Sequence, residues 1–267
     1  MRIGAKLVIL PLNLLGISLF IWPFYIDTEN SWLTSLSQAT WLAAIIALAA
    51  IGIIALKINS HLLDSKIVAL VAVLVGLIAA LRLLGAGAVG IEPMWFLLIL
   101  AARAFGPEIG YTIAILSISV SALITGGIGP WLPFQVFAAG WVALGVSLIP
   151  KFRNFQIERI AMATYGFFAS LLFGALMDLQ LWPWLLGTDT QLSYLSGAPV
   201  AENLSRFFAF HFATAMAWDL PRAVITASLI ILTSRPILFS LRRAQLRLST
   251  YAEWRGTSEL AQAQRES

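Results

Sequence analysis

The chain of 267 residues contains no cysteine and two histidines, and only 11% of its residues are charged. The missing cysteines exclude disulfides, thiolate metal sites and cysteine nucleophiles. Two histidines, His61 and His211, argue against a histidine-rich metal centre. The sequence also lacks a G-x-x-x-x-G-K-[ST] phosphate loop, a G-x-S-x-G motif and an H-E-x-x-H motif. We therefore expect no fused ATPase, no catalytic residues, no metal and no cofactor.

The apolar content of the chain is as unusual as its low charge. Hydrophobic residues make up 60% of it and the mean hydropathy is +0.87, whereas soluble domains are about 45–50% apolar and about 25% charged. The apolar residues fall in long blocks, which is typical of a polytopic membrane protein. The net charge of +4 is small and scattered, so it indicates no nucleic-acid partner.

The fold class predicted from these blocks is an all-α membrane helix bundle with about eight transmembrane helices. A span needs about 20 apolar residues, so the segment at 93–105 is short: either it is re-entrant or it forms a tight hairpin with the next one. The candidate segments are 5–26, 37–56, 66–84, 93–105, 109–125, 133–149, 158–178 and 205–234.

The positive charges predict the orientation. If the N-terminus is cytoplasmic, most of the 17 lysines and arginines lie on the cytoplasmic side, except Arg82, Arg206 and Arg222. We therefore expect a multi-pass protein of the inner (cytoplasmic) membrane with both termini in the cytoplasm.

Composition divides the chain into three parts. Residues 1–60 read as a two-helix N-terminal extension, and residues 61–240 as a six-helix core that holds most of the unusual polar residues. Residues 241–267 read as a basic cytoplasmic tail, helical at first and disordered at its end.

Small residues recur every four positions in the first helix of the core, at Ala72, Gly76 and Ala80. Such a stripe lets another helix approach closely. The pattern alone leaves open whether this helix belongs to the protein's own bundle or to a partner.

Ionisable residues at membrane depth usually face a cavity and pair. Asp219 and Arg222, three apart, predict either a structural pair or part of a ligand site. His211, Ala215, Trp218, Asp219 and Arg222 have the spacing of one helix face. Arg82 and Asp178 lie near the outer ends of their segments, where a solute would enter.

The expected outer loops combine glycine and tryptophan. The stretch 85–90 is rich in glycine and suits a gate over a pocket. Trp131 and Trp182 fit two interpretations equally well: an aromatic belt at the membrane interface, or rings that stack against a flat, mostly apolar solute.

Residues 66–236 resemble a substrate-binding S component of an energy-coupling factor (ECF) vitamin transporter, of an actinobacterial type akin to the cobalamin group. The order and spacing of several stretches carry the resemblance. They are Ala72–Ala80, Ile91–Pro93 after the glycine loop, Arg103–Gly110, Gly126–Phe134, Gly174–Asp178 with Trp182-Pro183, and Trp218–Arg222.

The resemblance implies a six-helix S-component core that binds a vitamin at the outer face, with cobalamin or a precursor as the first candidate. It also implies a transmembrane T component, which would dock on Ala72, Gly76 and Ala80, and two cytoplasmic ATPase subunits. The expected substrate-binding residues are Arg82, Glu92, Trp95, Trp131, Gln135, Asp178, Trp182, His211, Trp218, Asp219 and Arg222.

Two other functions stay open at this point. A stand-alone secondary transporter would need coupling carboxylates and broken helices at mid-membrane, often in two repeated halves, and no internal repeat is evident. A membrane enzyme of lipid or envelope metabolism would use Asp178, His211 and Asp219.

Overall fold

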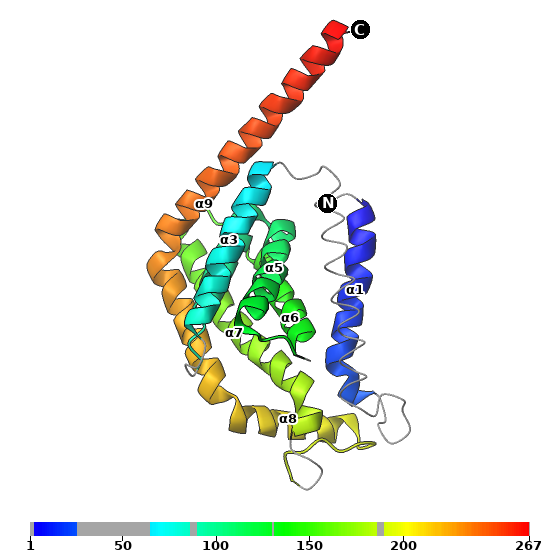
Figure 1. The fold of residues 1–267 in the computed structure, drawn as a ribbon. Coiled ribbons are helices and arrows are strands. Elements are labelled where there is room, and N and C mark those ends of the chain that lie inside the picture. The colour runs from blue at the N-terminus through cyan, green and yellow to red at the C-terminus, as the bar shows by residue number, and fades with distance from the viewer. Residues whose placement is uncertain (1–2, 26–64, 86–89, 130, 186–189, 267) are drawn as a thin grey trace.

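A computed structural model describes residues 3–25, 65–85, 90–129, 131–185 and 190–266. Within these ranges the chain forms eight α-helices and two short 3-10 helices, and no strand, which confirms the all-α prediction (Figure 1). The elements are α1 (Ile3–Ile21), η1 (Trp22–Phe24), α3 (Ser65–Leu84), α4 (Met94–Phe105), α5 (Pro107–Thr125), α6 (Leu132–Gly145), η2 (Val146–Leu148), α7 (Phe155–Leu185), α8 (Val200–Thr214) and α9 (Met216–Glu266).

Four of these helices, α3, α5, α7 and α9, are long and apolar enough to cross a bilayer. Their exposed side chains are largely aliphatic or aromatic, as at Val73, Leu172 and Leu232. A helix surface of this kind belongs in lipid rather than in water, so the chain is a membrane protein. The expected segment 37–56 lies outside the described residues.

The short segment of the sequence corresponds to α4, which has 12 residues and is about 18 Å long at 1.5 Å per residue. It lies at the centre of the bundle, and Leu98, Ile99 and Leu100 are fully buried. Gly106, with φ of 87°, turns the chain directly into α5. A Cβ at Gly110 would lie 2.6 Å from that of Ala102, so the two helices pack closely. Of the two alternatives for the segment at 93–105, re-entrant or hairpin, this close packing favours the tight hairpin with the next segment.

Helix α1 packs against α6. Phe20 is buried, with its ring centroid 5.0 Å from that of Phe134 in an edge-to-face arrangement. A Cβ at Gly16 would lie 3.1 Å from the Phe137 ring and 3.2 Å from the Trp141 ring. The first helix of the expected N-terminal extension therefore shares the hydrophobic core of the rest of the chain.

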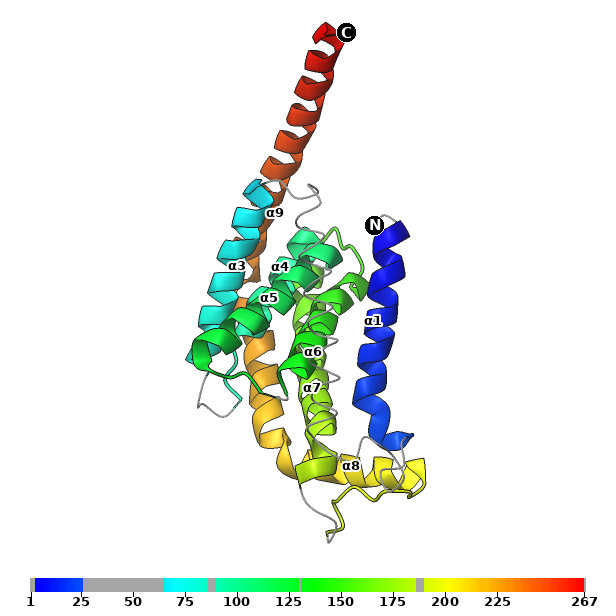
Figure 2. The same ribbon diagram turned by 45° about the vertical axis from the view of Figure 1, so that its right-hand side comes forward.

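The single helix expected over 205–234 is wrong. The chain breaks at Ala215, whose N–H closes α8 on the His211 carbonyl and whose carbonyl begins α9 by accepting from Trp218 and Asp219. Helix α8 lies across the end of the bundle while α9 runs along it (Figures 1 and 2). His211 therefore does not share a helix face with Trp218, Asp219 and Arg222. The break, rather than a common face, brings His211 near Asp219.

The two ends of the bundle carry different polar groups. One end of the bundle holds both termini (Figures 1 and 2). At that end, Glu158 of α7 accepts hydrogen bonds from Arg103 of α4 at 2.8 Å and from Arg242 of α9 at 2.6 Å. Asp178 lies twenty positions further along α7, about 30 Å away, at the opposite end. The expected tail belongs to α9, which extends as a helix to Glu266.

Candidate functional site

A buried arginine organises the polar residues at the end of the bundle remote from the termini. Arg222 of α9 donates from Nη1 to Oδ1 of Asp219, three residues earlier, which confirms the expected pair. Its Nη2 donates to Oε1 of Glu92 at 3.2 Å. Glu92 also accepts a 2.8 Å bond from the indole of Trp95. One guanidinium thus joins the start of α9 to the segment that leads into α4.

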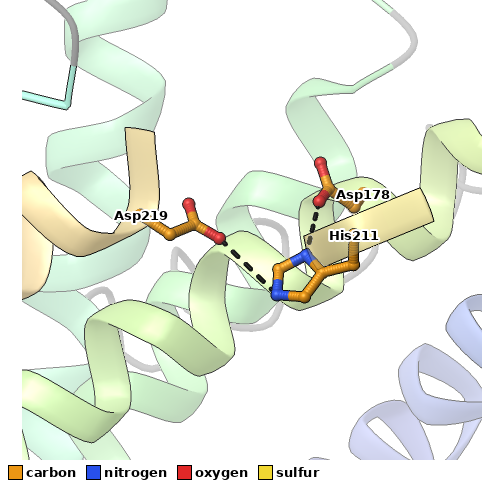
Figure 3. A group of neighbouring side chains, drawn as sticks. All are labelled: Asp178, His211 and Asp219. Carbon is orange, nitrogen blue, oxygen red and sulfur yellow. Dashed lines mark hydrogen bonds and ion pairs between the residues drawn. The ribbon is translucent and has the colours of Figure 1, made fainter. Parts of the chain in front are cut away.

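His211 lies between two aspartates (Figure 3). Its Nδ1 is 2.6 Å from Oδ2 of Asp178 on α7, and its Nε2 is 3.9 Å from Oδ2 of Asp219 on α9. His211 and Asp219 are almost completely buried, whereas Asp178 is partly exposed. Three helices therefore each contribute one titratable group to the same place, and we call Glu92, Asp178, His211, Asp219 and Arg222 the polar cluster.

Glycine at position 174 makes room for this cluster. A Cβ at Gly174 of α7 would overlap the carboxylate of Asp219, so only glycine leaves space for that side chain against α7. Gly174 belongs to a run of small residues at four-residue spacing that faces α9. Ser170 hydrogen-bonds Thr226 at 3.2 Å, and a Cβ at Gly166 would come within 3.0 Å of Thr226 and Ile230. Sequence reasoning missed this stripe, although its spacing is the one that singled out Ala72, Gly76 and Ala80.

Arg82 and Gln135, two of the expected site residues, lie close together. Arg82 of α3 donates to Oε1 of Gln135 on α6 at 2.8 Å and to Oγ of Ser121 on α5 at 2.6 Å. Its hydrogen bonds to the described residues all end on α5 and α6. Arg82 thus ties three helices together beside the polar cluster rather than within its hydrogen-bonded network.

The four tryptophans proposed as site residues divide into two pairs. Trp95 and Trp182 are each 1% exposed. Trp95 packs on Phe173 with a centroid distance of 4.3 Å, and Trp182 donates to the Leu192 carbonyl at 2.7 Å. Trp131 and Trp218 are 40% and 47% exposed. The buried pair is part of the hydrophobic core, and the exposed pair has the position expected of an interfacial belt.

The glycine-rich loop is fixed at both ends. A Cβ at Gly85 would overlap the Ile91 carbonyl, and one at Gly90, where φ is 66°, would overlap the Trp218 carbonyl. Gly90 therefore packs directly on the first turn of α9, beside Asp219 and Arg222. The centre of the expected gate, residues 86–89, lies outside the described residues.

The proposed docking stripe lies on the outer surface of α3. Ala72, Gly76 and Ala80 are all exposed, and a Cβ at Gly76 would meet nothing within 4 Å. The stripe therefore packs against none of the described helices. For the described helices, this excludes the interpretation that the stripe serves packing within the protein's own bundle.

Two cavities at the end that holds the termini were not predicted. One, of about 540 Å³, lies between α3 and α9 and is lined by Lys66, Leu70, Phe239, Arg243 and Arg247, among others. The other, of about 640 Å³, includes Arg103, Lys151, Glu158 and Arg242 in its wall.

Comparisons with models of known protein families, with curated protein sequences and with solved structures found no match for this chain.

Proposed function

We propose that this chain is a membrane-embedded substrate-binding (S) subunit of an ECF-type transporter. It imports a vitamin or a related micronutrient, with cobalamin or a precursor as the first candidate. The observation that carries the proposal is the polar cluster: five titratable side chains from α7, α8, α9 and the segment before α4 converge at one end of an otherwise apolar bundle. Buried ionisable groups in a membrane protein are costly, and they usually mark a solute site.

The position of the cluster agrees with binding from outside. The arginines on the distal half of α9 and the two basic residues of the 151–153 loop, Lys151 and Arg153, lie at the opposite end, with both termini. By the positive-inside rule that end is cytoplasmic, so the polar cluster faces the external side of an inner membrane.

Docking to a separate energising unit would use the exposed stripe on α3. Ala72, Gly76 and Ala80 form a smooth surface, and no described residue lies in front of Gly76. In lipid, helix association depends on such close packing because apolar side chains gain nothing by leaving the lipid. The proposed partner is a transmembrane T component, which in turn joins two cytoplasmic ATPases.

Cysteine labelling tests the orientation, and the chain has no native cysteine to confuse the result. Cysteines introduced at Ile128 and Gln191, both exposed at the cluster end, are expected to react with a membrane-impermeant maleimide in intact cells. Cysteines at Asn154 and Lys151 are expected to react only after the cells are opened. Labelling of Asn154→Cys in intact cells would reverse the orientation.

Uptake of radiolabelled cobalamin tests the function itself. Cells that lack their own cobalamin uptake would express the chain alone, or with a T component and ATPases encoded by the same organism. We expect uptake only with the partners, and none when the ATPases carry a substituted phosphate-loop lysine. Equal uptake by the chain alone would instead indicate a secondary transporter.

A membrane enzyme remains the second candidate because the structure brings together Asp178, His211 and Asp219, the residues that such an enzyme would use. An imidazole between two carboxylates is suited to proton transfer. Conversion of a lipid or envelope precursor by the purified chain, without solute uptake under any partner condition, would favour this alternative.

A further inference from the structure

We propose that His211 and Asp219, with Asp178 as the positioning residue, bind a divalent first-row transition-metal ion such as Zn²⁺ or Mn²⁺. The inference does not depend on the transport function, because ion binding is a property of the isolated chain. It differs from the expectation drawn from two histidines and no cysteine, since the structure places one of those histidines between two carboxylates.

The first argument is the direction of the donor atoms. Asp178 accepts a 2.6 Å hydrogen bond at Nδ1 of His211, so in neutral imidazole the single proton is on Nδ1. The lone pair of Nε2 then faces Oδ2 of Asp219 across 3.9 Å. This oxygen is buried and accepts no hydrogen bond from the described residues. Two acceptors that face each other in a buried site repel, and a cation held between them removes this repulsion.

The second argument is distance. Zinc lies about 2.0–2.1 Å from imidazole nitrogen and about 2.0–2.2 Å from carboxylate oxygen. His211 Nε2 and Asp219 Oδ2, which are 3.9 Å apart, can therefore both bind one ion, with a wide angle between the metal–nitrogen and metal–oxygen bonds. One atom from each of Asp178, His211 and Asp219 lies within 4.8 Å of the others. A histidine that gives its second N–H to a carboxylate is the usual arrangement behind a metal ligand.

The third argument is charge. The polar cluster holds three carboxylates, Glu92, Asp178 and Asp219, against the single guanidinium of Arg222. With neutral His211 its net charge is therefore −2, and a buried charge needs a partner of opposite sign. One divalent cation provides that charge at the point where the two acceptors face each other.

The donor set indicates the kind of metal. Imidazole suits zinc, iron, copper and nickel, whereas carboxylate, carbonyl and water oxygens suit magnesium, calcium and manganese. One imidazole with one carboxylate therefore favours Zn²⁺ most, and Mn²⁺ less strongly, over Mg²⁺. With two protein ligands, His211 and Asp219, the remaining positions are left to water or to an oxygen or nitrogen of a solute.

The test uses the full chain in detergent, purified without a histidine tag and treated with EDTA. Titration calorimetry with Zn²⁺ and Mn²⁺ is expected to show one ion per chain, and Mg²⁺ is expected to bind far more weakly. His211→Gln and Asp219→Asn should lower the affinity at least 100-fold, and Asp178→Asn about 10–100-fold, as for other groups that orient a ligand.

Two matched controls separate this site from adventitious binding. His61→Gln removes the other histidine of the chain, and Glu202→Gln removes an exposed carboxylate of α8, whose partner is Arg206. Both are expected to keep wild-type affinity. Unchanged binding in His211→Gln, or loss in His61→Gln, would place the ion elsewhere and overturn the proposal.

The wild-type chain alone also decides the question if the variants fail to fold. Zn²⁺ or Mn²⁺ should raise its melting temperature after EDTA treatment, because a ligand that binds only the folded state stabilises it. Absence of any shift and of any calorimetric signal would contradict the proposal. If the chain binds the ion but carries no co-purified vitamin, the metal proposal stands and the transport proposal fails. If a vitamin co-purifies and no ion binds, the transport proposal stands and the metal proposal fails.

Discussion

Gly174→Ala is expected to disrupt the polar cluster with a single methyl group. The new Cβ would overlap the Asp219 carboxylate, which is confined by Arg222 on its other side. If Asp219 moves away, the Arg222 guanidinium loses one of its two carboxylate partners in a buried site. Breaking a buried ion pair costs about 3–5 kcal/mol, so the melting temperature in detergent should fall markedly and bound ligand should be lost.

Gly76→Ala is the matched control for this variant. Gly76 is also a helical glycine, but no atom of the described residues lies within 4 Å of a Cβ placed there. Alanine is favoured over glycine in a helix interior by about 1 kcal/mol, so the control should be as stable as the wild type or slightly more so. Equal stability and ligand content in Gly174→Ala and the wild type would contradict the close contact between α7 and Asp219.

Gly76→Leu is expected to abolish assembly with the energising partner while the isolated chain stays folded. Leucine has open space in front of it among the described residues, yet it would hold a partner helix away from the small-residue surface. Co-purification of a tagged T component should be lost, and cobalamin uptake with it. The melting temperature and ligand content of the variant alone should match the wild type.

Ser228→Leu provides the comparison for that result. Ser228 is an exposed small residue of α9, outside the stripe formed by Ala72, Gly76 and Ala80. A leucine there should leave assembly and uptake unchanged. Normal assembly of Gly76→Leu, or equal loss in Ser228→Leu, would show that the stripe is not the docking surface.

Apolar block length predicts most of the helices because a span has a required length. The short block at 93–105 becomes α4, and the tight turn at Gly106 follows from glycine before Pro107. The break between α8 and α9 leaves no such signal, because residues 205–234 have no glycine and the break at Ala215 lacks an adjacent proline. Block length therefore predicts one helix where there are two.

The pairings within the site depend on that break and on contacts that are distant in sequence. Asp219 and Arg222 are predictable as a pair because they are three residues apart on one helix. Glu92 and Arg222 are 130 residues apart, and no local rule joins them. His211 and Asp219 would lie about 12 Å apart along a continuous helix, whereas the break leaves 3.9 Å between their nearest charged atoms.

Tryptophan shows the limit of composition as a guide to a binding site. Trp182 has the outer position expected of a pocket wall, but its indole donates to the Leu192 carbonyl and its ring packs on Tyr194 and Phe207. The sequence identifies a large amphipathic ring near the interface. Only the tertiary packing decides whether the ring faces a solute or the core.

The most direct test of the central claim is mass spectrometry of the small molecules that co-purify with the detergent-solubilised chain. The wild type is compared with Gly174→Ala and with the Gly76→Ala control. We predict that one vitamin or vitamin precursor accompanies the wild type and the control in near-stoichiometric amount and is absent from Gly174→Ala. Only lipids in all three preparations, or a vitamin retained equally by Gly174→Ala, would contradict a substrate site built on the polar cluster.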